Sequence, residues 1–541
     1  MRRAALAAAL LLAAAPAAAQ ISADRIKADV KTLASDAFGG RGPGQPGEAK
    51  TVQFLSEQFG KAGLAPGGEN GGWTQDVKLI RYDRGPVTMS ARVGGATIPL
   101  VAGKDVTASS RILGETVLSG APLVFAGYGI ADPAIGWTGF AGADLNGKVA
   151  VLIANDPDFE AAAPGAFGGR TLVYAGRFGA KVEAAAKAGA VAVLVVHETA
   201  AASYPWSQVG NGDSVPTFGL DFGTVDAKPL GLRGWLHRDV AADLFKRAGL
   251  DFEKLKAAAR DGAFKPVAIG NATLSTRFST TATPFVSRNV VALLKGKAHP
   301  DETIIYGAHW DANGTGPADA KGDTIRNGAV DNATGTATLI EVARAFAAGP
   351  QPDRSILFIG YTAEEKGLLG AEWYAAKPLR PLETTVAVLN LDPHVVLGAA
   401  RNLDLIGGGR TPLEADLKRI AAKHDLRVDD EANPEAGWYF RSDHFAFAKK
   451  GVPTVYFRAG RDLIDGGFAA GNKVADAYNE RDYHQTTDEF DAGWSFAGAA
   501  QEATVAYEIG RELATSRRWP DWNDGVDFKT VRNRSAAARR P

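Results

Sequence analysis

Hydrophobic and polar positions alternate in a regular way along the second half of the chain. Short, uninterrupted apolar runs, which are typical of buried strands, occupy residues 289–294, 303–306, 355–359 and 385–389. Between them, the apolar residues recur every third or fourth position over residues 336–347 and 367–375, as expected for helices that bury one face. This order predicts an α/β fold, with a mixed central sheet flanked by helices.

The first half of the chain has a different pattern. Residues 21–65 predict two amphipathic helices, separated by a glycine-rich loop at 39–44. Residues 85–275 contain further strand-like runs and a helix at 182–188 but no dense cluster of metal-binding side chains. We expect its His197 and His237 to be structural or exposed rather than catalytic.

Composition narrows the chemistry. The 541 residues exceed one ordinary core, and the formal net charge of -1 gives no basic excess for nucleic-acid binding. The chain has no cysteine, which excludes disulfides, thiolate nucleophiles and thiolate metal ligands. Imidazole and carboxylate must therefore hold any metal, which favours zinc, manganese or cobalt.

The N-terminus predicts export. Arg2 and Arg3 precede an apolar stretch over residues 4–15, and small residues at 17–19 form a cleavage site, as in a secretory signal peptide. This stretch is too short to span a bilayer, and no other segment is apolar enough to do so. Removing the two arginines with the peptide changes the formal net charge from -1 to -3. We expect a periplasmic or secreted protein without a membrane span.

Candidate metal-binding side chains follow the predicted strands or open the predicted helices. They lie in five segments: His309-Trp310-Asp311, Gly328-Ala329-Val330-Asp331-Asn332, Glu364-Glu365, Asn390-Leu391-Asp392 and Tyr483-His484. Ligand sites in α/β sheets lie at the carboxyl ends of strands. The five segments supply enough imidazoles and carboxylates for two divalent ions, with one carboxylate to spare as a base.

Individual segments leave alternatives open. Asp331 lies in a small-residue turn before a helix, where it is either a metal ligand or a helix cap. The adjacent Glu364 and Glu365, expected at a helix start, point about 100 degrees apart, so that one can bind a metal while the other reaches water. The Asp311 carboxylate, two residues after His309, is suited to hold the far nitrogen of a metal-bound imidazole.

Taken in order, these segments resemble the dizinc metallopeptidases of the bacterial leucyl aminopeptidase and aminopeptidase Y type. The resemblance covers nearly the whole mature chain. It includes Leu33-Ala34-Ser35-Asp36, Gly40-Arg41, Gly47-Glu48, Ser442-Asp443-His444 and Gly451-Val452-Pro453. Residues 147–152 and 187–190 are similar to the protease-associated (PA) domain that is inserted in many relatives. The resemblance implies a zinc-exopeptidase fold with this domain inserted.

The domain division that follows has five parts. They are a signal peptide (1–19), the N-terminal part of the peptidase domain (20–110), the protease-associated insert (111–275), the metal-binding catalytic domain (276–515) and a C-terminal extension (516–541). The end of the extension, from Lys529, is basic and alanine-rich, and is expected to be disordered.

The resemblance also implies residue roles. One of two zinc ions is expected on His309, Asp331 and Asp392, and the other on Asp331, Glu365 and His484, so that Asp331 bridges them. Glu364 is then the general base and Asp311 orients His309. The implied activity is hydrolysis of the N-terminal residue of a peptide with a free N-terminus, by a hydroxide that bridges the ions. Manganese or cobalt are possible substitutes for zinc. A cis peptide bond is expected at Asp331-Asn332.

Three further residues are candidates for substrate contact. Tyr439, just before Ser442-Asp443-His444, is expected either to stabilise the oxyanion or to pack against the pocket rim, and His444 belongs to that motif. His394 stands two residues after Asp392, where relatives commonly have a methionine and a glycine, and would face the same side of an extended backbone.

Other functions remain open from the sequence. A glutaminyl cyclase-like acyltransferase shares the fold but uses one zinc ion. A glutamate carboxypeptidase-like exopeptidase would need basic residues such as Arg441 or Arg458 in the pocket to hold a terminal carboxylate. A non-catalytic protein resembling the transferrin receptor ectodomain would have lost the metal site, whereas every ligand position is intact here.

Overall fold

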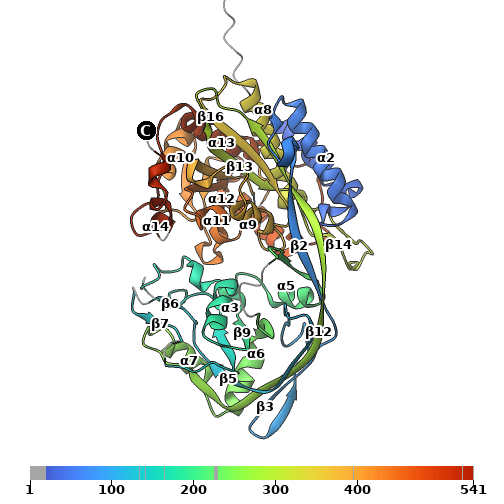
Figure 1. The fold of residues 1–541 in the computed structure, drawn as a ribbon, viewed down its shortest axis with the longest axis vertical. Helices are drawn as coiled ribbons and strands as arrows, with labels where there is room; N and C mark the ends of the chain where they lie inside the picture. Colours follow the sequence, from blue (N-terminus) through green and yellow to red (C-terminus); the bar gives the residue numbers. More distant parts are fainter. Residues whose placement is uncertain are drawn as a thin grey trace, which may run out of the picture.

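Two lobes, joined by long strands, make up the molecule (Figure 1). The structure, a computed structural model, describes residues 20–539 except 133, 134, 141, 162, 164, 224–228, 394 and 527. The predicted signal peptide at residues 1–19 lies outside the described residues. No helix within the described part of the chain is long and apolar enough to cross a membrane.

The upper lobe in Figure 1 is built on a mixed sheet, as predicted. Its four central strands, in the order β16, β13, β17 and β20, are parallel to one another. Antiparallel strands β12 and β18 flank them, and β19 lies at the edge. The bounds of these strands are β12 (Val267–Leu294), β13 (His299–His309), β16 (Arg354–Tyr361), β17 (Thr385–Asn390), β18 (Asn402–Leu405), β19 (Arg427–Asp430) and β20 (Thr454–Ala459).

Helices cover both faces of this sheet. Side chains of β13 and β16 alternate between two cores: Tyr306 and Phe358 pack into one, and Ile305 and Leu357 into the other. Burial on both faces explains why these strands appear in the sequence as continuous apolar runs. The first core is closed by α1 (Ala23–Leu33), α2 (Pro46–Lys61), α8 (Gly335–Ala348), α10 (Leu413–Ala422) and α13 (Ala497–Thr515), and the second by α9 (Leu369–Ala376) and α11 (His444–Ala448).

The lower lobe is a smaller α/β unit with its own cores. It contains the predicted insert, residues 111–275, whose identity as a protease-associated domain stays a prediction. Its strands include β3 (Thr88–Val93), β4 (Ala96–Pro99), β5 (Gly114–Phe125), β8 (Val149–Ile153), β9 (Ala192–His197) and β11 (Leu232–His237), and the short β6 (Ala131–Asp132), β7 (Trp137–Thr138) and β10 (Thr217–Leu220). Its helices are α3 (Phe178–Lys187), α4 (Thr199–Ala202), α5 (Trp206–Asn211), α6 (Arg238–Arg247) and α7 (Phe252–Ala258).

Strand β12 joins the lobes and is much longer than the apolar run at 289–294 that predicted it. Its first part pairs with β3 and β5 in the lower lobe, and its last part with β16 in the upper lobe. Between these ends it pairs with β2 (Thr74–Arg84). Much of its earlier length alternates between buried and exposed residues, so the search for continuous apolar runs missed it.

The C-terminal end differs from the prediction of disorder, which is wrong over residues 529–539. Helix α14 (Phe528–Asn533) and a short 3-10 helix at Ala536–Arg539 are formed there. Arg532 is only 2% exposed, and its Nη1 donates a hydrogen bond to the carbonyl of Thr385 at 3.0 Å. The basic composition suggested a solvated tail, but its arginines bind backbone carbonyls instead.

Candidate metal centre

The carboxyl ends of three parallel strands meet at one edge of the upper sheet. His309 is the last residue of β13, Glu364 follows the end of β16 by three residues, and Asp392 follows the end of β17 by two. Parallel alignment brings these chain ends together. The residues directly after each strand therefore reach this edge, and the parallel pairing of the strands brings their side chains together.

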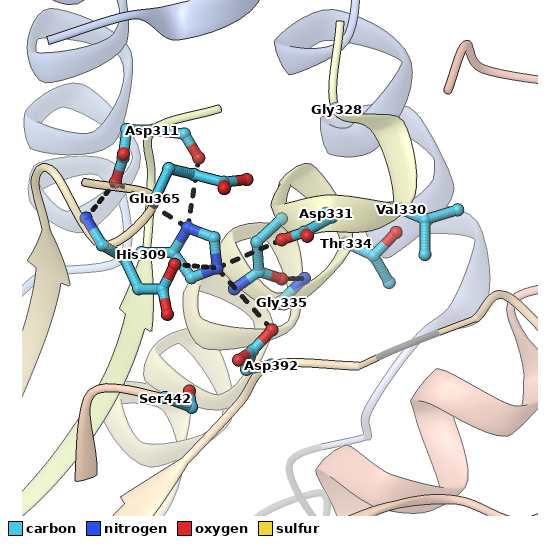
Figure 2. Close-up of polar contacts among 12 residues, drawn as sticks. His309, Asp311, Gly328, Val330, Asp331, Thr334, Gly335, Glu365, Asp392 and Ser442 are labelled. Atoms are coloured by element: carbon cyan, nitrogen blue, oxygen red, sulfur yellow. Dashed lines mark hydrogen bonds and ion pairs between the residues drawn. The ribbon is translucent and has the colours of Figure 1, made fainter. Parts of the chain in front are cut away.

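Asp331 lies between two histidines, and Figure 2 shows its carboxylate facing the imidazole of His309. Its Oδ1 is 3.3 Å from Nε2 of His309, and its Oδ2 is 3.3 Å from Nε2 of His484. Asp331 is not the N-cap of α8, which is Thr334; the side chain of the neighbouring Asn332 accepts a hydrogen bond from the amide of Gly335 at 2.8 Å. The peptide bond between Asp331 and Asn332 is cis, which confirms that prediction.

The imidazole of His309 is buried, and its Nδ1, on the side away from the carboxylate cluster, is held by the backbone. Its Nδ1 lies 3.1 Å from the backbone carbonyl of Asp311, whereas the Asp311 carboxylate is farther away at 3.7 Å. That carboxylate instead accepts a hydrogen bond from the amide of Glu364 at 3.0 Å. Asp311 thus orients the histidine through its main chain and the glutamate turn through its side chain, which differs from the predicted carboxylate-imidazole contact.

Glu364 and Glu365 lie in a tight turn, not at a helix start as predicted, because α9 begins only at Leu369. The amides of Gly367 and Leu368 both bind the carbonyl of Glu364, each at 2.8 Å. The turn directs the two side chains apart. Oε2 of Glu365 lies 3.0 Å from Nε2 of His484, and Oε2 of Glu364 lies 3.9 Å from Nε2 of His309.

The predicted ligands and base therefore form two groups of potential ligand atoms: His309, Glu364 and Asp392, and Asp331, Glu365 and His484. In the first group, Asp392 Oδ1 is 3.6 Å from Nε2 of His309. Asp331 reaches both groups and is closer to His309 than Glu364 is. The predicted metal ligands are thus all brought together, with Glu364 at the border of the cluster.

Charge accumulates in this buried cluster. Burial alone would lower the pKa of His309, but the carboxylates of Glu364 and Asp331 hold it well above its usual value. Burial would also lower the pKa of His484, but the carboxylates of Glu365 and Asp331 outweigh it and raise that pKa to about 10. Burial disfavours the charged form of Asp331, yet the two imidazoles hold its pKa well below the usual range. The carboxylates of this buried cluster therefore strongly favour a bound positive charge, whether a proton on the histidines or a cation.

The donor set fits zinc. Zinc in proteins binds imidazole nitrogen and carboxylate oxygen, and both kinds of atom converge here in each group. Oε1 of Glu365 is also buried and has no hydrogen-bond partner among the described residues. A buried carboxylate oxygen without a donor is costly, and a divalent cation would compensate it.

Two residues that support Asp331 were not identified from the sequence. Asp488, 3% exposed, accepts hydrogen bonds from the amides of Val330 at 2.9 Å and Asp331 at 3.2 Å. Arg41, fully buried, donates to the carbonyls of Asn327 and Gly328 on the same turn. The position of Asp488, four residues after the candidate ligand His484, is the feature of the sequence that could have identified it. In the sequence, Arg41 stands only within the Gly40-Arg41 motif, which does not reveal these contacts.

The predicted substrate-contacting residues are not at the cluster. Tyr439 is 3% exposed, and its hydroxyl is 2.9 Å from Oγ1 of Thr454. His444 is fully buried between the rings of Tyr439 and Tyr456, and burial lowers its pKa to about 3. Both side chains pack the interior, which for Tyr439 agrees with the packing alternative, and a substrate contact by either residue stays a prediction. His394 lies outside the described residues.

A cavity of about 300 Å³ opens beside the cluster, between the two lobes. Glu364, Glu365 and His484 line one part of it, together with Arg441 from the same lobe. The lower lobe supplies much of the remaining wall, including Arg177. The lower lobe therefore helps to shape the space that a substrate would enter.

Comparison with known proteins agrees with this arrangement. Residues 289–507 match the sequence model of Peptidase family M28. That range contains every predicted metal ligand and Glu364.

Individual relatives are similar over shorter stretches. A probable zinc metalloprotease of Pyrenophora teres f. teres is 41% identical over 103 residues, 19% of this chain and 22% of that protein. Aminopeptidase NAALADL1 of Mus musculus is 36% identical over 119 residues, 21% of this chain and 14% of that protein. The matched segment thus spans less than a quarter of these curated relatives.

One solved structure shares the fold over most of the chain. The aminopeptidase from Aneurinibacillus sp. strain AM-1 is 22% identical, with a TM-score of 0.52, over 92% of this chain and 95% of its own. The expected α/β fold, a mixed sheet flanked by helices, is therefore shared with this structure.

Proposed function

Because residues 289–507 match the sequence model of Peptidase family M28, we propose that this chain is an exported, zinc-dependent aminopeptidase of that family. One observation carries the proposal: Asp331 presents one carboxylate oxygen to each of two histidines, His309 and His484, at 3.3 Å. Asp392 and Glu365 complete two ligand groups around this bridge. Such a paired arrangement supports two zinc ions rather than one.

Different residues of the chain would bind the metal, transfer the proton and position the base during hydrolysis. Bound zinc would polarise the scissile carbonyl and make water easier to deprotonate. Glu364 accepts a proton from the attacking water at its carboxylate and donates it to the leaving amine as the carbon–nitrogen bond breaks. Asp311 holds the Glu364 turn in place through the Glu364 amide. The products are a free amino acid and the peptide shortened by that residue.

The position of Glu364 supports this role. It borders the ligand cluster, 3.9 Å from His309, and also lines the cavity between the lobes. A base must lie within reach of both the water and the leaving amine. Glu365, by contrast, is turned toward His484 at 3.0 Å and is suited to ligation.

A panel of peptides tests the proposal. The zinc-loaded full chain should cleave peptides with a free N-terminus and should not cleave the same peptides after N-acetylation. Zinc analysis by mass spectrometry should give two ions per chain, and exhaustive chelation should abolish the activity until zinc is restored. Cleavage that survives N-acetylation would support a carboxypeptidase instead. One zinc ion, with ring closure of peptides that begin with glutamine, would support a cyclase.

A further inference from the structure

A pair of arginines faces the cavity next to the candidate metal centre. Arg177 comes from the lower lobe and Arg441 from the upper lobe, and both line the cavity that Glu364 and His484 also line. The two guanidinium groups are close enough for Arg441 to lower the pKa of Arg177, after burial, which is the larger cause. Two like charges at one wall repel each other, so something must favour their placement there.

Arg177 has unused hydrogen-bonding capacity. Its Nη1 is buried and has no hydrogen-bond partner among the residues that the structure describes. A guanidinium carries five donors, and leaving buried donors unpaired is costly. An acceptor held against the Arg177 guanidinium would offset part of this cost.

Arg441 is fixed by contacts between the lobes. Its Nη2 donates to Oγ of Ser203 at 3.0 Å, and its guanidinium lies over the rings of Tyr204 and Trp438, at 5.5 and 5.0 Å. These contacts order its long side chain before any ligand binds. A preordered guanidinium loses less conformational entropy when it binds an anion.

Nearby carboxylates offset the charge of this pair only in part: the Glu364 carboxylate raises the pKa of Arg177, but burial and Arg441 outweigh it. Glu435, which also lines the cavity, is bonded to Arg170 at 2.9 Å. Glu364 and Glu365 are directed into the histidine cluster. The backbone start of helix α3, which follows Arg177 directly and has no side-chain cap, adds a further partial positive charge.

We propose that Arg177 and Arg441 form a carboxylate-binding subsite, so that the chain prefers short peptides carrying a carboxylate near the scissile bond. The forked guanidinium matches the geometry of a carboxylate, which can accept two parallel hydrogen bonds. The cavity volume of about 300 Å³ is at the lower end for small-molecule sites, which favours short peptides. The carboxylate is that of a free C-terminus or of an acidic side chain. This inference rests on the proposed peptidase function and gives the lower lobe a part in substrate selection.

Three matched substrate pairs test the preference with the zinc-loaded wild type. Leu-Ala against its C-terminal amide tests the terminal carboxylate. Glu-Ala amide against Gln-Ala amide tests an acidic first residue, and Leu-Glu amide against Leu-Gln amide tests an acidic second residue. We expect kcat/KM to favour the carboxylate by about 10- to 100-fold in at least one pair, as lost charge-assisted hydrogen bonds would predict. The pair that discriminates identifies the source of the carboxylate.

Substitutions then assign the preference to the arginines. Arg177→Met and Arg441→Met should each move the discriminating ratio toward one. Arg233→Met is the matched control, because Arg233 is also largely buried in the lower lobe but does not line the cavity; it should keep the ratio. Zinc content and circular dichroism verify that each variant is folded.

Two results would overturn the inference while leaving the peptidase function intact. One is hydrolysis of all three pairs without preference for the carboxylate by the wild type. The other is a preference that persists in both folded arginine variants. Absence of hydrolysis for every peptide, the neutral amides included, would instead reject the proposed function itself.

Discussion

The carboxylate of Asp488 provides the sharpest test of how the metal centre is held. Its two oxygens accept separate hydrogen bonds from the amides of Val330 and Asp331, at 2.9 and 3.2 Å. In Asp488→Asn the side chain keeps its shape but has only one oxygen, so an NH2 group must face one of these amides. The change therefore alters the support of Asp331 without removing any proposed ligand.

The expected magnitude follows from these contacts. Loss of one charge-assisted hydrogen bond to a buried amide lowers the free energy of unfolding by about 1.5–3 kcal/mol. The new NH2 group also faces a backbone N–H, and two donors that face each other add to that cost. Residues that position metal ligands change metal affinity by about 10- to 100-fold when substituted. We expect Asp488→Asn to weaken zinc binding by that factor, with kcat/KM falling in parallel at limiting zinc.

Chelator competition measures the zinc affinity, and urea unfolding of the metal-free chain measures the free energy of unfolding. Asp158→Asn is the control: Asp158 is also buried and binds three backbone amides in the lower lobe, all through Oδ2. It should leave zinc affinity unchanged. Equal zinc affinity of the wild type and the Asp488→Asn chain would refute the positioning role of Asp488.

Three further predictions concern the base, the N-terminal segment and the lower lobe. Glu364→Gln should lower kcat by about 10²- to 10⁴-fold with zinc content unchanged, measured on an N-terminally free peptide, whereas Glu372→Gln on α9 should not. Arg41→Met should destabilise the chain by about 3–5 kcal/mol in urea unfolding, because it removes a buried charge with four backbone acceptors; a loss below about 1 kcal/mol would contradict this role. Burial lowers the pKa of Lys181 to about 7. The unfolded chain therefore binds more protons above that pH, and the free energy of unfolding should rise between pH 7 and 10 more steeply in the wild type than in Lys181→Met.

The sequence predicted which candidate ligands lie together because their positions depend on local features. A continuous apolar run marks each buried strand, and the polar residue directly after it lies at the sheet edge. His309 and Asp392 follow this rule closely. Asp331 required the glycine-rich turn before α8 as a second signal.

Features that depend on the approach of distant segments were missed. The sequence leaves Tyr439 two roles, at the oxyanion or in packing, and only the folded chain shows that its hydroxyl contacts Thr454 in the interior. The polar alternation along β12 concealed a strand that crosses both lobes. The juxtaposition of Arg177 with Arg441 arises only when the two lobes meet.

Arg41 explains why the N-terminal segment belongs to the metal centre although it contributes no ligand. Its guanidinium donates to the carbonyls of Leu33, Trp310, Asn327 and Gly328, the last three from 269 to 287 residues away in sequence. Trp310 follows a proposed ligand directly, and Gly328 opens the turn that carries Asp331. Gly40 has a φ of 65°, and a Cβ there would lie 2.5 Å from the carbonyl oxygen of Arg326, so only glycine fits before the arginine. The pair Gly40-Arg41 thus ties the first helices to both ligand-bearing loops across the inserted lobe, and the ligand geometry depends on a segment that precedes that lobe.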